Sequence, residues 1–125
     1  MAHLLLIDDD ESFRPMLREN LEQMGHTVTE ARNGKEGLAH YASAPADLVL
    51  TDLIMPEKEG IETILDLRKK WPDVKIIAMS GGGRGSAASY LKTAQQLGAQ
   101  YVLAKPFSND ELVAAINNML PTKES

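Results

Sequence analysis

Polar residues with matched chemistry stand at the ends of four short apolar runs in this chain. An acid pair, Asp8 and Asp9, follows the first run, and a lone acid, Asp52, ends another. A hydroxyl, Ser80, and an ammonium, Lys105, follow two later runs. Carboxylates gathered at one site repel each other, by about 4 kcal/mol for two unit charges about 4 Å apart near a protein surface. A proton or a cation must offset that repulsion.

These side-chain types favour a small hydrated cation and a phosphoryl group. Carboxylate oxygens and water suit Mg²⁺ better than Zn²⁺ or Ca²⁺, and no histidine falls near the expected site. Asp52 would be the nucleophile that takes the phosphoryl group. Lys105 and the cation would offset the phosphoryl charge, and Ser80 would donate a hydrogen bond to it.

Strands and helices that alternate along the chain would position these residues. The expected strands are 4–7, 27–31, 47–52, 74–80 and 101–104, and the expected helices are 13–24, 35–42, 61–71, 90–97 and 109–120. Such alternation predicts an α/β fold in which helices cover both faces of a parallel sheet, because the crossovers are right-handed. Ser12 could cap the first helix, and Ser108 and Glu111 could form a capping box at the last.

The order of the strands decides which residues meet. The strand at 27–31 is more polar than the others, which is typical of an edge strand. We therefore expect a doubly wound (βα)5 arrangement with strand order 2-1-3-4-5. In this order the first and third strands end side by side, at the point where the winding reverses. Asp8, Asp9 and Asp52 would converge there.

Length and composition limit the classes of protein. The 125 residues, 43% of them hydrophobic, suffice for one core, so we expect a single domain over 1–125 with no output domain after it. No apolar run is long enough to cross a membrane, and no secretory signal opens the chain. The absence of cysteine rules out disulfides and thiolate metal sites and is typical of a cytoplasmic protein. The net charge of −5 argues against direct binding to nucleic acid.

Taken singly, each of these features has a plainer explanation. A lone Asp at a strand end is more often a cap or a turn residue, and a lone Lys is usually a solvated surface residue. The acidic run 8–10 could begin a Ca²⁺ loop, but Phe13 stands where that loop needs glycine. The run 81–86 is rich in glycine but lacks the Gly-Lys-Ser/Thr ending of a phosphate-binding loop. Only the joint placement of the strand ends favours phosphoryl chemistry.

The same residues stand in the order and approximate spacing of a known family. The chain resembles the receiver domain of two-component response regulators over nearly its whole length, through Leu6-Ile7-Asp8-Asp9-Asp10, Asp52-Leu53-Ile54-Met55-Pro56, Ser80 and Lys105-Pro106. The likeness is to the single-domain type, similar to the chemotaxis response regulator. It implies a flavodoxin-like fold and a phosphoryl donor that is a sensor histidine kinase or a histidine phosphotransfer protein.

The resemblance also implies how the cation and the phosphoryl group are held. Mg²⁺ (or Mn²⁺) would be bound by Asp9, Asp52 and the backbone carbonyl of Ile54. Asp8 would act mainly through water. A cis peptide bond before Pro106 would help to aim the lysine that precedes it.

A further set of residues would convert phosphorylation into a signal. Tyr101 falls at the position of the family's aromatic switch and would move together with Ser80. Their movement would alter the face formed by the fourth helix, the fifth strand and the fifth helix, through which two copies of the chain could also pair. Gly81 and Gly82 belong to a loop richer in glycine than most in the family, and Gly82 offers no side chain to hinder an attacking water.

We expect a signalling domain that catalyses only its own phosphorylation and dephosphorylation, not an enzyme that acts on other substrates. The sequence does not identify its downstream protein target, and we expect no membrane partner. One alternative is a receiver-like interaction module that is not phosphorylated. A less favoured alternative is an aspartyl-phosphate hydrolase, because such enzymes commonly carry a second acid two residues after the nucleophile, where Ile54 stands.

Overall fold

A five-stranded parallel sheet forms the centre of this computed structural model, which describes residues 2–52, 59–80, 92, 95–96 and 98–120. The strands are β1 (His3–Ile7), β2 (Thr27–Ala31), β3 (Leu48–Asp52), β4 (Ile76–Ser80) and β5 (Tyr101–Ala104). The helices are α1 (Phe13–Gln23), α2 (Gly34–Ser43), α3 (Glu59–Lys70) and α5 (Asn109–Met119). The strand order is β2-β1-β3-β4-β5 with every neighbouring pair parallel, which confirms the predicted order.

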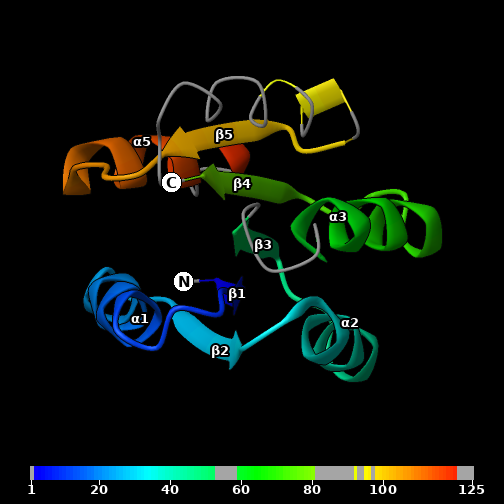
Figure 1. Cartoon of the computed structure of the whole chain (residues 1–125). Helices are drawn as coiled ribbons and strands as arrows, with labels where there is room; N and C mark the ends of the chain where they lie inside the picture. The colour runs from blue at the N-terminus through cyan, green and yellow to red at the C-terminus, as the bar shows by residue number, and fades with distance from the viewer. Residues whose placement is uncertain (1, 53–58, 81–91, 93–94, 97, 121–125) are drawn as a thin grey trace.

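Helices cover both faces of the sheet (Figure 1). Helices α1 and α5 pack on one face, and α2 and α3 pack on the other. Of the helix expected at 90–97, the structure describes only residues 92, 95 and 96, which are helical. Gly81 and Gly82, like Ile54, lie outside the described residues. In the described segments, none of the helices has the length and apolar character needed to cross a bilayer.

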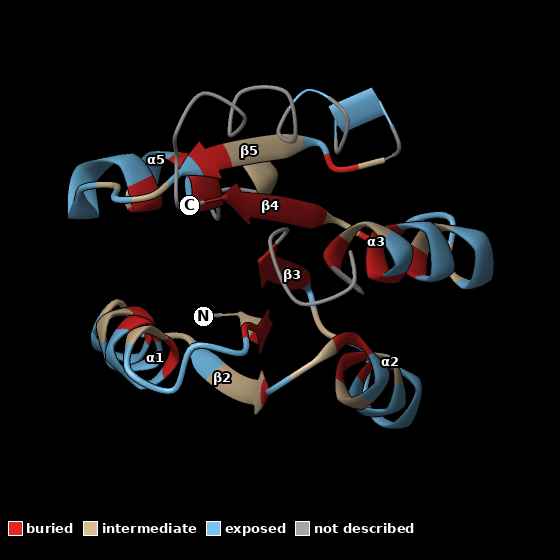
Figure 2. Cartoon of the chain, viewed as in Figure 1, coloured by how far each residue is buried: buried red, intermediate tan, exposed pale blue. Residues whose placement is uncertain are grey.

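The central strands are apolar because both of their faces are buried (Figure 2). In β1, Leu4 and Leu6 join the core beneath α1 and α5, whereas Leu5 and Ile7 join the core beneath α2 and α3. All residues of β3 and β4 are buried, while most of β2 is only half-buried, as predicted for an edge strand. Each fully buried leucine stabilises the fold by about 1.5–3 kcal/mol relative to an exposed one.

Side-chain caps fix where α1 and α5 begin. At α5 the predicted capping box is confirmed, because Ser108 Oγ accepts from the Glu111 N–H at 3.0 Å and Glu111 Oε1 accepts from the Ser108 N–H at 2.8 Å. At α1 the prediction is wrong. Ser12 makes no side-chain cap bond because its own backbone is already helical, and Asp10 Oδ1 accepts instead from the N–H groups of Ser12 and Phe13. These two bonds hold the pKa of the Asp10 carboxyl below its usual range, and the bond from Phe13 has the larger effect.

An ion-pair network ties α1 to the edge strand β2. Arg14 is only 6% exposed, and its Nε donates to Glu30 Oε1 at 2.7 Å. Arg18, one turn further along α1, donates to the other oxygen of Glu30 at 2.8 Å. The hydrogen bond from Arg18, together with that from Arg14, holds the pKa of the Glu30 carboxyl below its usual value, although burial acts in the opposite direction.

A glycine lets α2 lie directly against β1. A Cβ atom at Gly37 would stand 2.3 Å from Cδ1 and 2.8 Å from Cγ1 of Ile7, far inside normal contact distance. Ile7 is fully buried and directly precedes Asp8 in the chain. The close approach therefore fixes the helix against the strand that carries the acid pair.

The substitution Gly37→Ala should lower the free energy of unfolding by about 1–3 kcal/mol. Overpacking against Ile7 should outweigh the gain of ~1 kcal/mol that alanine brings to a helix interior. Ile7→Val removes the nearest atom, so the double variant should lose less stability than the two single variants added together. Urea unfolding of the four proteins measures this coupling, and strictly additive losses would contradict the contact.

Glu30 gives the fold a predictable dependence on pH. Because its pKa is depressed, the ionised carboxylate stabilises the fold above the ordinary pKa, and this contribution is lost as the pH falls through the depressed pKa. Glu30→Gln should lower the free energy of unfolding by roughly 1–3 kcal/mol at neutral pH, because Arg14 loses a partner inside the protein. The difference in the free energy of unfolding between Glu30→Gln and the unsubstituted protein should shrink as the pH falls from about 5 toward 3.

Urea unfolding across this pH range measures the effect. Glu22→Gln is the control, because Glu22 and its partner Arg18 are both 44% exposed and such pairs contribute little. A stability difference for Glu30→Gln that stays constant from neutral to acid pH would contradict the assignment.

Candidate functional site

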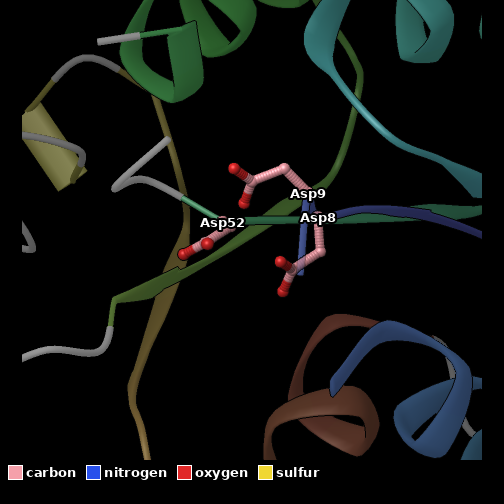
Figure 3. A group of neighbouring side chains, drawn as sticks. All are labelled: Asp8, Asp9 and Asp52. Carbon is pink, nitrogen blue, oxygen red and sulfur yellow. The ribbon is translucent and has the colours of Figure 1, made fainter. Parts of the chain in front are cut away.

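Three carboxylates meet at the carboxyl-terminal edge of the sheet, as the sequence predicted (Figure 3). Asp52 is the last residue of β3, and Asp8 and Asp9 directly follow β1. The two strands are neighbours, with Ile7 paired to Thr51, so the residues that follow lie side by side. One oxygen from each carboxylate lies within 4.8 Å of the others.

The three acids differ in burial. Asp8 is fully buried and Asp52 is 5% exposed, whereas Asp9 is exposed. A buried carboxylate costs several kcal/mol unless hydrogen bonds and opposite charge hold it. Both oxygens of Asp8 are held in this way, because Oδ1 accepts from the Asp10 N–H at 2.9 Å and Oδ2 accepts from Lys105 Nζ at 2.9 Å. Asp8 is thus fixed in place, while Asp9 faces water.

Lys105 brings a positive charge to the cluster from the end of the edge strand β5. It follows β5, and its Nζ lies 2.9 Å from Asp8 Oδ2 and 3.6 Å from Asp52 Oδ2. The side chain is 16% exposed, so most of it is withdrawn from water. The peptide bond between Lys105 and Pro106 is cis, as the resemblance implied. The backbone N–H of Lys105 donates to the carbonyl oxygen of Ser80 at 2.8 Å, which ties the lysine to the end of β4.

Ser80 places the predicted hydroxyl at the same edge. It ends β4, the strand between β3 and β5. The residue is fully buried, and within the described part of the chain its Oγ makes no hydrogen bond. Buried hydroxyls are nearly always hydrogen-bonded in folded proteins. This hydroxyl therefore has a donor and an acceptor to offer to a ligand at the edge of the sheet.

Tyr101 is not brought to the cluster. It begins β5 opposite Ile77, at the end of the strand away from the acids. Its half-buried ring packs with the core beneath α1 and α5, whereas its neighbour Val102 packs with the core beneath α2 and α3. Its role as a switch stays a prediction.

Two residues of α1 contact the cluster without having been predicted. Arg14 Nη1 donates to the backbone oxygen of Asp8 at 2.7 Å, and the ring centroid of Phe13 lies 4.0 Å from Lys105 Nζ. The sequence held a signal for Arg14, because it shares the helical spacing of the buried residues Leu17 and Leu21. No local pattern links Phe13 to a lysine that follows the last strand.

The donors of the cluster suit a hard divalent cation. In formal charges, three carboxylates and one ammonium leave two negative charges, which one divalent cation would cancel. The acidic cluster found in the described part of the chain offers carboxylate oxygens alone. Such a donor set fits Mg²⁺ or Mn²⁺ rather than a metal that prefers nitrogen or sulfur.

Comparison with known proteins agrees with this geometry. The family model described as the response regulator receiver domain matches residues 4–117. The chemotaxis protein CheY of Bacillus subtilis is 36% identical over 122 residues, which cover 96% of this chain and 99% of CheY. The transcriptional regulator NtrC of Azospirillum brasilense is 34% identical over 119 residues, which cover 95% of this chain but only 24% of NtrC.

A solved structure shares both the fold and the sequence pattern. The response regulator TrrA of Thermotoga maritima, in a crystal structure with Mg²⁺ and beryllium fluoride, is 31% identical with a TM-score of 0.84. The match covers 96% of this chain and 100% of that one. The family model, the similarity to CheY and the flavodoxin-like order of the sheet lead to one conclusion: the chain belongs to the receiver domain family of two-component response regulators.

Proposed function

We propose that this receiver domain accepts a phosphoryl group on Asp52 and signals through the change that follows. The observation that carries the proposal is the place of Asp52 in the acidic cluster, beside the ammonium of Lys105. Its carboxylate is only 5% exposed, lies in a cluster with Asp8 and Asp9, and has the Lys105 ammonium at 3.6 Å. An acid in these surroundings can act as a nucleophile toward an anionic group, because nearby positive charge offsets the charge that the group brings.

The reaction would move a phosphoryl group from a donor histidine to Asp52. A carboxylate oxygen of Asp52 would attack phosphorus and form an acyl phosphate, while the P–N bond breaks and its electron pair stays on the donor imidazole. Lys105 would offset charge on the phosphoryl oxygens, and Ser80 Oγ would donate a hydrogen bond to one of them. The donor would be a sensor histidine kinase or a histidine phosphotransfer protein, in keeping with the family.

A divalent cation would complete the site. Asp9 and Asp52 would hold Mg²⁺ or Mn²⁺ together with the carbonyl of Ile54, which lies outside the described residues. Asp8 would act through water, since both of its oxygens already accept hydrogen bonds from the protein. When bound, the cation supplies positive charge beside the phosphoryl oxygens. The presence of Mg²⁺ and beryllium fluoride in the TrrA structure supports this part of the proposal.

The signal would pass from the hydroxyl at the end of β4 to neighbouring elements. Ser80 would follow the phosphoryl group and alter the face made by residues 90–97, β5 and α5. That face would bind a downstream protein and could pair two copies of the chain. The proposal assigns no nucleic acid to it, in keeping with the net charge of −5.

Acetyl phosphate and intact-mass measurement test the phosphoacceptor directly. The unsubstituted protein should gain one phosphoryl group with Mg²⁺ and lose that gain with a chelator, and Asp52→Asn should gain none. Asp66→Asn is the matched control, because Asp66 is exposed on α3 and should leave uptake unchanged. Equal uptake by Asp52→Asn would sink the proposal, as would absence of both uptake and beryllofluoride binding in the unsubstituted protein.

A further inference from the structure

An aromatic ring lies against the ammonium of the cluster. Lys105 Nζ stands 4.0 Å from the ring centroid of Phe13, the first residue of α1. The same nitrogen donates to Asp8 Oδ2 at 2.9 Å, so the ammonium is held between a carboxylate and a ring face. Cations within about 6 Å of a ring centroid are attracted by the negative face of the ring, more strongly when water is excluded. With a lysine side chain only 16% exposed, this attraction is weakly screened.

The ring is itself held in a fixed orientation. Phe107 packs against Phe13 with ring centroids 6.0 Å apart and planes at 86°, an edge-to-face contact. Such pairs are favoured because a positive ring edge meets a negative ring face. The backbone N–H of Phe13 donates to Asp10 Oδ1 at 3.0 Å, which anchors the residue to the acidic turn. These contacts support the ring in the orientation that presents its face to the ammonium.

The carboxylates and the ring together oppose movement of the lysine into water. A lysine ammonium is strongly hydrated and sits on a flexible four-carbon stem, so it gains entropy and hydration by swinging into water. Asp8 alone offers one hydrogen bond, and Asp52 lies at the longer distance of 3.6 Å. The ring face adds an attraction that does not occupy a carboxylate oxygen.

We propose that Phe13 is a positioning residue for phosphoryl transfer, whose ring face holds the Lys105 ammonium at the acidic cluster in readiness for the phosphoryl group. The inference rests on the proposed function of Asp52. It assigns to Phe13 a task beyond packing. The half-buried ring of Phe13 also packs against the core beneath α1 and α5. A test must therefore change the electrostatics of the ring without changing its size.

Fluorinated phenylalanines placed site-specifically at position 13 meet this requirement. Each fluorine weakens the negative face of the ring while its shape is nearly kept. The rate of uptake from acetyl phosphate at saturating Mg²⁺ should fall stepwise along the mono-, di- and trifluoro series, reaching about fivefold at the end. Thermal unfolding should stay nearly constant along the series. A flat or rising rate would overturn the proposal.

NMR of the unphosphorylated protein gives a second readout. The ε protons of Lys105 should be shifted upfield by the ring current of Phe13. Phe13→Leu should abolish this shift and slow phosphoryl uptake, and Phe13→Tyr, which keeps the ring face, should restore both. If Phe13→Leu kept the full rate of uptake, packing alone would be sufficient at this position, and the proposal would be overturned.

The two readouts separate the possible failures. If the unsubstituted protein takes up no phosphoryl group, the proposed function of Asp52 fails, and the Lys105 shift still reports where the ammonium lies. If uptake is normal and unchanged along the fluorinated series, only the role of Phe13 fails.

Discussion

The contact between Lys105 and Asp8 is the constraint on which the site depends. Three carboxylates within 4.8 Å would repel one another strongly, and the ammonium 2.9 Å from Asp8 and 3.6 Å from Asp52 offsets part of that repulsion. Strands β1 and β5 are separated by β3 and β4, which places them about 14 Å apart at ordinary strand spacing. The lysine and the turn after β1 must both reach across the sheet edge. The contact therefore depends on the observed order of β1, β3, β4 and β5.

Much of this arrangement could be predicted because it follows from patterns within short stretches. Continuous apolar runs identified the buried strands, and the more polar strand at 27–31 indicated an edge, which favoured the strand order that the structure has. With that order, Asp8 and Asp52 had to lie side by side, because Asp8 follows β1, Asp52 ends β3, and these two strands are neighbours. The capping box of Ser108 and Glu111 was equally local and equally predictable.

The details that could not be predicted depend on contacts between distant segments. Phe13 meets Lys105, and Arg14 meets Glu30 and the Asp8 carbonyl, only after α1 has docked on the sheet. The cap of α1 was assigned to the wrong side chain because serine and aspartate are both good caps, and backbone conformation chose between them. In each case the missing information is the angle at which an element packs, which periodicity in the sequence does not contain.

Chemical mapping of the phosphorylated residue is the sharpest test of Asp52 as the phosphoacceptor. Borohydride reduces an acyl phosphate to an alcohol, so an aspartyl phosphate becomes homoserine, which tandem mass spectrometry locates in the sequence. After treatment with acetyl phosphate and Mg²⁺, homoserine should stand in place of Asp52, with unchanged aspartate at positions 8 and 9. Homoserine in place of Asp8 or Asp9, with Asp52 unchanged, would contradict it.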